Sequence, residues 1–289
     1  MEALKNYIDQ IIQQQVAGDS WKWLKDKVSG INIAAPFNLA FAAIPRKIGK
    51  ERINITEEQV KEIQQLRAGF SIENWTIDRL CRVWLLMHLD ASKKEAYTGK
   101  IENLFLTADM KEQVALYSAL PILAYPPYWQ KRCAEGIRSN IGDVLQAIMC
   151  NNPYPAEQLP QAAWNQMVLK AFFTEKPVNE IIGLDERANE ELAHILSDYA
   201  HERWAAHRTV NPLLWRCVAR FVDDTIFPDI KRIAVSESKP ERLAAALVCR
   251  ESSYPPAKAL VNGNIYLQSM VKNAALSWDT LARETANDQ

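Results

Sequence analysis

The chain has 289 residues, of which 48% are hydrophobic, and its 34 lysines and arginines nearly balance 35 aspartates and glutamates. This composition excludes a disordered chain, and the formal net charge of −1 gives no general attraction to nucleic acid or to anionic lipid. Only nine residues are glycine, which argues against glycine-rich phosphate loops and against a turn-dense β fold.

The cysteines and the N-terminus indicate a cellular compartment. The five cysteines stand singly, without a C-x-x-C pair, which is typical of reduced thiols in a cytoplasmic protein. The start MEALKNYIDQ lacks the basic segment and apolar run of a signal peptide. The longest apolar stretches contain proline and are shorter than the ~20 residues that a membrane-spanning helix needs. We therefore expect a soluble cytoplasmic protein with no nucleic-acid partner.

Helical periodicity predicts helices along nearly the whole chain. The predicted helices cover residues 2–18, 20–28, 36–44, a segment after the capping box of Thr56 and Gln59, 75–89, 109–123, 129–150, 160–173, 188–207, 211–222, a segment after the capping box of Ser238 and Glu241, 257–261 and 267–283. No segment alternates convincingly as a strand. Prolines recur every roughly 35–45 residues, once per helical pair. We predict an all-α fold of stacked helical hairpins, either a HEAT-like α-solenoid or an irregular helical bundle. It forms one domain over residues 1–289, with a frayed tail at 284–289.

Three consecutive predicted helices each place a polar residue inside their apolar arc, at ~100° per residue. These residues are Asn140 in helix 129–150, Asn165 in helix 160–173 and Arg203 in helix 188–207. A buried arginine needs a facing carboxylate, and the candidates are Glu135, Asp185 and Glu202. Further polar side chains on the edges of the same helices could join them, namely Arg138, Gln166 and Lys170.

These residues allow two interpretations. They could form an interhelical polar network that fixes the register of the stack. Alternatively they could line a pocket, in which Arg203 and Lys170 bind an anionic or oxygen-rich ligand and the asparagines orient it. In that pocket Glu135, His201 or Glu202 would transfer protons. The candidate ligand-binding residues are therefore Arg138, Asn140, Asn165, Gln166, Lys170 and Arg203.

Two other patterns give weaker hypotheses. His194, Asp198 and His201 share one helical face, but without a fourth ligand they do not predict a metal site, and we expect neither a metal nor a cofactor. The segment 37–52 joins the apolar run FNLAFAAI to four cations, Arg46, Lys47, Lys50 and Arg52. This combination fits either a peripheral membrane anchor or a solvated loop, and we expect the loop.

Several long segments resemble the EboA family, which comprises helical proteins of the bacterial ebo gene cluster. They are EGIRSN (135–140), NPYPAE (152–157), AAWNQMVLKAFF (162–173), ANEELAHILSDYAHERWAAHR (188–208) and LWRC (214–217). The resemblance is close over residues 116–217, and the flanks share only helical character and length. It brings no catalytic residues with it. It implies a gene context that includes a prenyltransferase-like membrane protein, a sugar-phosphate-cyclase-like enzyme and hydrolase-like proteins, and that is linked with making or exporting a secondary metabolite.

The resemblance therefore implies a non-catalytic accessory or binding protein in a secondary-metabolite biosynthesis or export pathway. Its expected partners are a small-molecule intermediate or other proteins of the ebo cluster. An enzyme acting on a cyclitol, isoprenoid or aromatic intermediate is the alternative, and a peripheral membrane partner of the prenyltransferase is a third. The sequence alone does not decide among them, nor does it give the oligomeric state.

Overall fold

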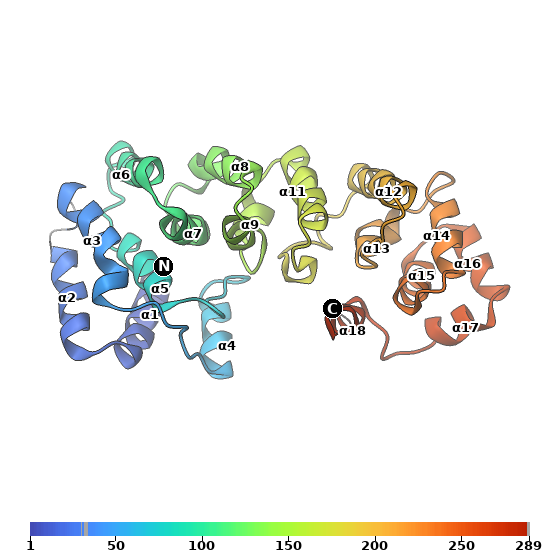
Figure 1. The fold of residues 1–289 in the computed structure, drawn as a ribbon, viewed down its shortest axis with the longest axis horizontal. Helices are drawn as coiled ribbons and strands as arrows, with labels where there is room; N and C mark the ends of the chain where they lie inside the picture. The colour runs from blue at the N-terminus through green and yellow to red at the C-terminus, as the bar shows by residue number, and fades with distance from the viewer. Residues whose placement is uncertain (30, 32–33, 288–289) are drawn as a thin grey trace. The chain divides into compact units, whose positions relative to one another are not determined.

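The computed structural model describes residues 1–29, 31 and 34–287, and the chain divides into two compact units, residues 1–159 and 160–289. Among the described residues, all regular structure is helical, apart from one isolated antiparallel bridge between Arg52 and Thr76. The predicted all-α class is therefore confirmed (Figure 1). Each unit is described by itself below, and the expectation of a single domain stays a prediction.

The first unit is built from short helices joined by tight turns. In chain order its α-helices are α1 (Glu2–Gln15), α2 (Gly18–Ser29), α3 (Ala34–Lys47), α4 (Glu57–Leu66), α5 (Ile77–Leu86), α6 (Lys94–Thr107), α7 (Met110–Ala119), α8 (Gln130–Arg138), α9 (Gly142–Met149) and α10 (Tyr154–Gln158). Two 3₁₀ turns, η1 (Leu120–Ile122) and η2 (Pro126–Trp129), lie between α7 and α8. The predicted capping box at α4 is confirmed, because Thr56 and Gln59 each bond the other's backbone N–H.

Helix α5 is the centre of the first unit. All but one of its residues are buried, including the charged Asp78 and Arg82. It packs against α1, α3 and α7, and α7 in turn packs against α9. The stacking of alternate helices is typical of helical-hairpin folds. A buried ion pair at i and i+4 lies inside this core, with Arg82 Nη1 2.6 Å from Asp78 Oδ2. The arginine also donates its Nε–H to the carbonyl oxygen of Phe41.

The structure bears on two predictions about the first unit. The predicted helix 129–150 is wrong in its middle, because the chain leaves the helix after Arg138 and re-enters it at Gly142. The apolar side chains of segment 37–52 point inward, since Phe37, Phe41 and Ile44 are each at most 1% exposed within this unit. Only Leu39 on α3 exposes a large apolar side chain, so the apolar face needed for a membrane anchor is already covered by α2 and α5.

The second unit begins with a helical hairpin and ends in a bundle around one helix. Its α-helices are α11 (Gln161–Phe173), α12 (Glu190–Ala205), α13 (Leu214–Val218), α14 (Phe227–Ala234), α15 (Lys239–Glu251), α16 (Pro255–Asn262), α17 (Ile265–Val271) and α18 (Trp278–Asn287). The 3₁₀ turns are η3 (Val178–Glu180) and η4 (Ala219–Phe221).

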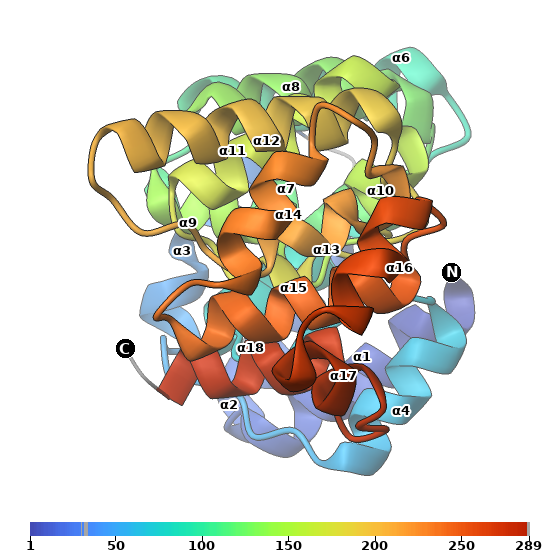
Figure 2. The same cartoon turned by 90° about the vertical axis from the view of Figure 1, so that its right-hand side faces the viewer.

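Helix α15 is the core element of this bundle, and Figure 2 shows it among its neighbours. It packs against α13, α14, α16, α17 and α18. Residues 243–249, with the sequence LAAALVC, are all buried. The three consecutive alanines let neighbouring helices approach from several sides, because a methyl group takes little space. Ser238 caps the helix by accepting the backbone N–H of Glu241, so one half of the predicted capping box is confirmed. In place of the other half, the N–H of Ser238 donates to the hydroxyl of Ser236.

The C-terminal segment differs from its prediction in two ways. The predicted helix 267–283 is interrupted, and α17 and α18 are separate helices. The tail predicted to be frayed is helical through Asn287, and residues 288–289 lie outside the described part of the chain. Two side-chain contacts of α18 explain why the tail is helical. Trp278 donates its indole N–H to Glu251, and Lys239 pairs with Glu284, so α18 is attached to both ends of α15.

Candidate functional site

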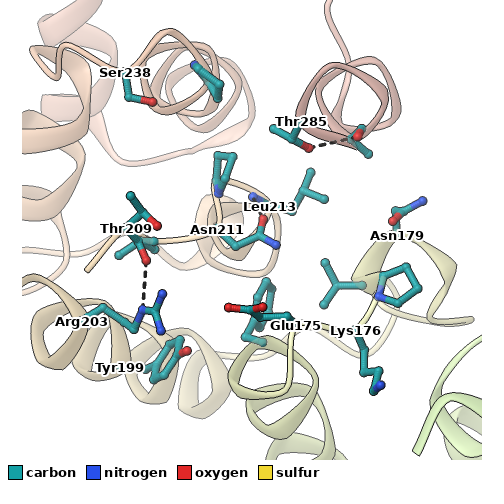
Figure 3. A pocket seen from close by; sticks show the side chains of 17 residues that line it. Glu175, Lys176, Asn179, Tyr199, Arg203, Thr209, Asn211, Leu213, Ser238 and Thr285 are labelled. Carbon is teal, nitrogen blue, oxygen red and sulfur yellow. Dashed lines mark hydrogen bonds between the residues drawn. The ribbon is translucent and has the colours of Figure 1, made fainter. Parts of the chain in front are cut away.

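The second unit contains a cleft of about 600 Å³ (Figure 3). This volume lies in the range of small-molecule sites. Its walls come from the end of α11 and the turn that follows, from the last turns of α12, from the loop 209–213, from the start of α15 and from α18. Segments far apart in the sequence therefore meet at one place, which is the usual way in which a rigid scaffold builds a site.

The first wall is formed where α11 ends. Thr174 closes the helix, and Glu175 follows with φ of 54°, in the left-handed region that favours glycine. The N–H of Lys176 then bonds back to the carbonyl oxygen of Ala171 at 2.9 Å, which fixes this turn. Glu175 thus has a defined position at the cleft, at a local cost of about 1 kcal/mol for a residue with a side chain.

The second wall is formed by α12, which contributes Tyr199 and Arg203. Arg203 donates its Nε–H to the carbonyl oxygen of Thr209 at 2.9 Å, so the guanidinium is held beside the loop that follows the helix. The expectation that Arg203 is buried against Glu135, Asp185 or Glu202 is wrong. The side chain is only half-buried, and Asp185 instead pairs with Arg216 through two bonds of 2.6 Å.

The remaining walls combine polar and apolar groups. Ser238 and Pro240 come from the start of α15, and Ala282 and Thr285 come from α18. Apolar surface between them is supplied by Phe172, Pro177, Val178, Val210, Pro212 and Leu213, and amide groups are supplied by Asn179 and Asn211. The cleft therefore offers hydrogen-bonding groups and apolar surface in about equal measure, a combination that suits a small polar organic molecule.

Asn165 has a structural role outside the cleft. It is 1% exposed, and its amide exchanges hydrogen bonds with the side chain of Asn189, the residue that caps the N-terminus of α12. Its Nδ2–H also reaches Glu191 Oε2 at 3.1 Å. The asparagine in the apolar arc of α11 therefore ties that helix to the first turn of α12. This arrangement matches the interhelical network among the two interpretations of the sequence.

His201 faces a different neighbour from Arg203, because two residues along a helix differ by about 200°. Its Nε2 lies 2.6 Å from Oδ1 of Asp229, a buried carboxylate in α14 that also accepts the hydroxyl of Ser197. His194 pairs in the same way with Asp223. The polar face predicted to meet solvent thus joins α12 to the segment around α14. Among the described residues, no group of three or more histidines, cysteines, aspartates or glutamates is arranged to hold a metal ion.

The other candidates on the second unit do not line the cleft. Gln166 and Glu202 are exposed, and Lys170 is half-buried one turn before the end of α11. Of the sequence-predicted ligand-binding residues, only Arg203 contributes to this cleft.

The candidates in the first unit are placed at the end of α8. Glu135 pairs with Arg132 at 2.9 Å, and Arg132 also contacts Glu102. Arg138 is exposed in the last turn of the helix. Asn140 is exposed in the break between α8 and α9, so the expectation that it points inward is wrong. It failed because the periodicity argument assumed one continuous helix.

Several residues of the cleft were not predicted from the sequence. Glu175, Asn179 and Asn211 lie in turns, where no periodicity indicates direction. Thr285 was assigned to a frayed tail. One usable signal existed, since Asn211-Pro212 and Ser238 mark helix starts, and helix starts gather at this cleft.

The fold and the cleft together define a class: an all-helical protein of stacked hairpins whose second unit contains a cleft of small-molecule size. The family comparison refines this, because residues 4–219 match the family described as "Metabolite traffic protein EboA". The chain belongs to the EboA family. The match extends beyond residues 116–217. It includes three of the segments that line the cleft, namely the end of α11 with its following turn, the last turns of α12 and the loop 209–213, whereas α15 and α18 follow it. Comparison with curated proteins and with solved structures gives no match.

Proposed function

We propose that this protein is a non-catalytic binding protein that holds a small-molecule intermediate of a secondary-metabolite biosynthesis or export pathway. The cleft of the second unit carries the proposal, because its volume and mixed lining suit a metabolite. The family description supports a role in metabolite handling in general terms. Other proteins of the ebo cluster would deliver or receive the ligand in the cytoplasm. No helix in the described part of the chain has the length and apolar character that crossing a bilayer requires.

An enzyme remains the second candidate because of His201. A half-exposed imidazole held by a buried carboxylate is an arrangement that proton-transferring enzymes use. However, the ring lies beside Trp204, which stacks on Trp215 and carries Arg232 over its face at 4.2 Å. His201 also does not line the cleft to which Arg203 belongs. We therefore assign His201 a role in joining α12 to α14.

A thermal-shift screen against fractionated bacterial metabolite extracts tests the proposal. A ligand that binds only the folded protein raises its melting temperature. The matched variant is Thr285→Trp, which places an indole in the cleft from α18, and the control is Arg283→Trp on the exposed side of the same helix. We expect active fractions to stabilise the wild type and Arg283→Trp but not Thr285→Trp.

Catalysis is tested on the same fractions. The active compound, incubated with the protein and recovered for mass spectrometry, should be unchanged. Conversion of the compound, lost in His201→Gln, would instead support the enzyme. Stabilisation of Thr285→Trp equal to that of the wild type would show that the cleft is not the site.

A further inference from the structure

Two opposite charges belong to the same cleft without pairing. Arg203 and Glu175 both line it, and Figure 3 shows their charged ends on the same side of the cavity. Within the part of the chain that the structure describes, neither side chain forms an ion pair. A ligand that brings a negative group to the arginine and a hydrogen-bond donor to the glutamate would satisfy both side chains.

Arg203 has hydrogen-bond donors free to bind an acidic group. Its Nε–H is used by the carbonyl oxygen of Thr209 at 2.9 Å, which limits the swing of the side chain. The two terminal NH₂ groups keep donors in a planar fork that matches a carboxylate through two parallel hydrogen bonds. The other cation of the lining, Lys176, points its ammonium away from the cleft centre in Figure 3. An acid would therefore be bound by Arg203.

Glu175 can accept hydrogen bonds from a donor group of the ligand. The left-handed turn at the end of α11 fixes its backbone, its side chain is exposed at the cleft, and an ionised carboxylate only accepts hydrogen bonds. In a cleft it would repel the acid of a ligand unless the ligand also brings a hydroxyl or ammonium group to it. Apolar surface from the half-buried Tyr199 and Pro212 remains for the body of the ligand.

We propose that the cleft binds a small organic acid that also carries a hydroxyl or ammonium group, with the carboxylate on Arg203 and the donor on Glu175. This assignment rests on the proposed function, because it names the ligand class of the same site. The chemistry shared by hydroxy acids and amino acids is an acid next to a hydrogen-bond donor, and the probes below separate the two.

A matched series of probes with one phenyl body tests the proposal. Phenyllactate and phenylalanine carry acid and donor, phenylpropanoate carries only the acid, and phenylethanol carries only a donor. Titration calorimetry should give a dissociation constant of about a millimolar for whichever of phenyllactate and phenylalanine binds more tightly, as expected for ligands of this size. Phenyllactate or phenylalanine should bind about tenfold more tightly than phenylpropanoate, and phenylethanol should bind most weakly.

Variants assign each group of the ligand to its residue. Arg203→Met should weaken binding of all three acids about tenfold or more and leave phenylethanol unchanged. Glu175→Gln should bring the better probe down to the level of phenylpropanoate. Lys258→Gln is the control, because Lys258 is exposed on α16 and does not line the cleft; this variant should bind the series as the wild type does. Circular dichroism melting of each variant distinguishes a lost contact from a lost fold.

Two results would overturn the ligand class. If phenylpropanoate binds at least as tightly as both two-group probes, and Glu175→Gln strengthens it, Glu175 only repels acids. If none of the probes binds, the assignment to this class fails. The metabolite screen with Thr285→Trp decides the proposed function separately, since that readout does not depend on acids or donors.

Discussion

Replacing Asn165 by alanine would remove the side chain that ties α11 to the capped start of α12. Three hydrogen bonds disappear, two with the side chain of Asn189 at 2.9 and 3.3 Å and one with Glu191 at 3.1 Å. At a net value of about 0.5–1.5 kcal/mol each, the loss is roughly 2–4 kcal/mol. Asn189 keeps its cap on the N–H of Leu192, so α12 itself should still form.

Urea unfolding followed by circular dichroism measures this loss. Gln166→Ala is the matched control, because Gln166 is the next residue of α11 and is exposed; we expect a change within about 0.5 kcal/mol. The double variant with Asn189→Ala should cost less than the sum of the two single changes by about 1–2 kcal/mol, since both remove the same bonds. A loss for Asn165→Ala no larger than that of Gln166→Ala, or strictly additive changes, would refute the network.

Three further predictions concern the helix ends, the close helix contacts and the thiols. Glu175→Gly should raise the free energy of unfolding by about 0.5–1 kcal/mol, because glycine adopts φ of 54° freely. Lys176→Gly, the control, should lower the free energy of unfolding. Urea titration measures both variants. Gly136→Ala should lower the free energy of unfolding by about 1–3 kcal/mol, because the new methyl would lie within 2.6 Å of side chains of α7 and α9, while Gly99→Ala, with open space around it, should raise it. All five cysteines are buried, and burial raises the pKa of the Cys217 thiol to about 12 and that of Cys249 to about 11. Because the thiolate is the reactive form, we expect iodoacetamide to label no cysteine of the native protein at neutral pH and all five in urea; rapid labelling without denaturant would contradict this.

The sequence predicted the helical class because apolar residues recur at helical spacing in nearly every segment. It also located the capped starts of α4 and α15. At α4 Thr56 and Gln59 each accept the other's backbone N–H, whereas at α15 only Ser238 accepts one, from Glu241. The ends of helices were harder to predict from the sequence. The break at Asn140 carries neither glycine nor proline at the point where α8 stops, so periodicity ran through it.

The candidate site was predictable only in part, for a physical reason. Arg203 was found because a charge in an apolar arc is unusual on a helix. Its partner in the cleft, Glu175, follows the helix in a turn, where direction depends on one backbone angle that the sequence does not specify. Asn165 looked like the same kind of signal, yet its amide is used entirely between two helices. Inward polar residues therefore indicate that a partner is needed, and only coordinates show whether the partner is protein or ligand.

The measurement that tests the account most directly is the release of bound small molecules from protein purified from the cells in which it naturally occurs. Wild type, Thr285→Trp and Arg283→Trp are denatured in parallel, and the released compounds are identified and counted by mass spectrometry. We predict one compound, close to one per chain, from the wild type and Arg283→Trp, and its absence from Thr285→Trp. Equal amounts from all three proteins, or none from the wild type, would contradict a metabolite-binding cleft in the second unit.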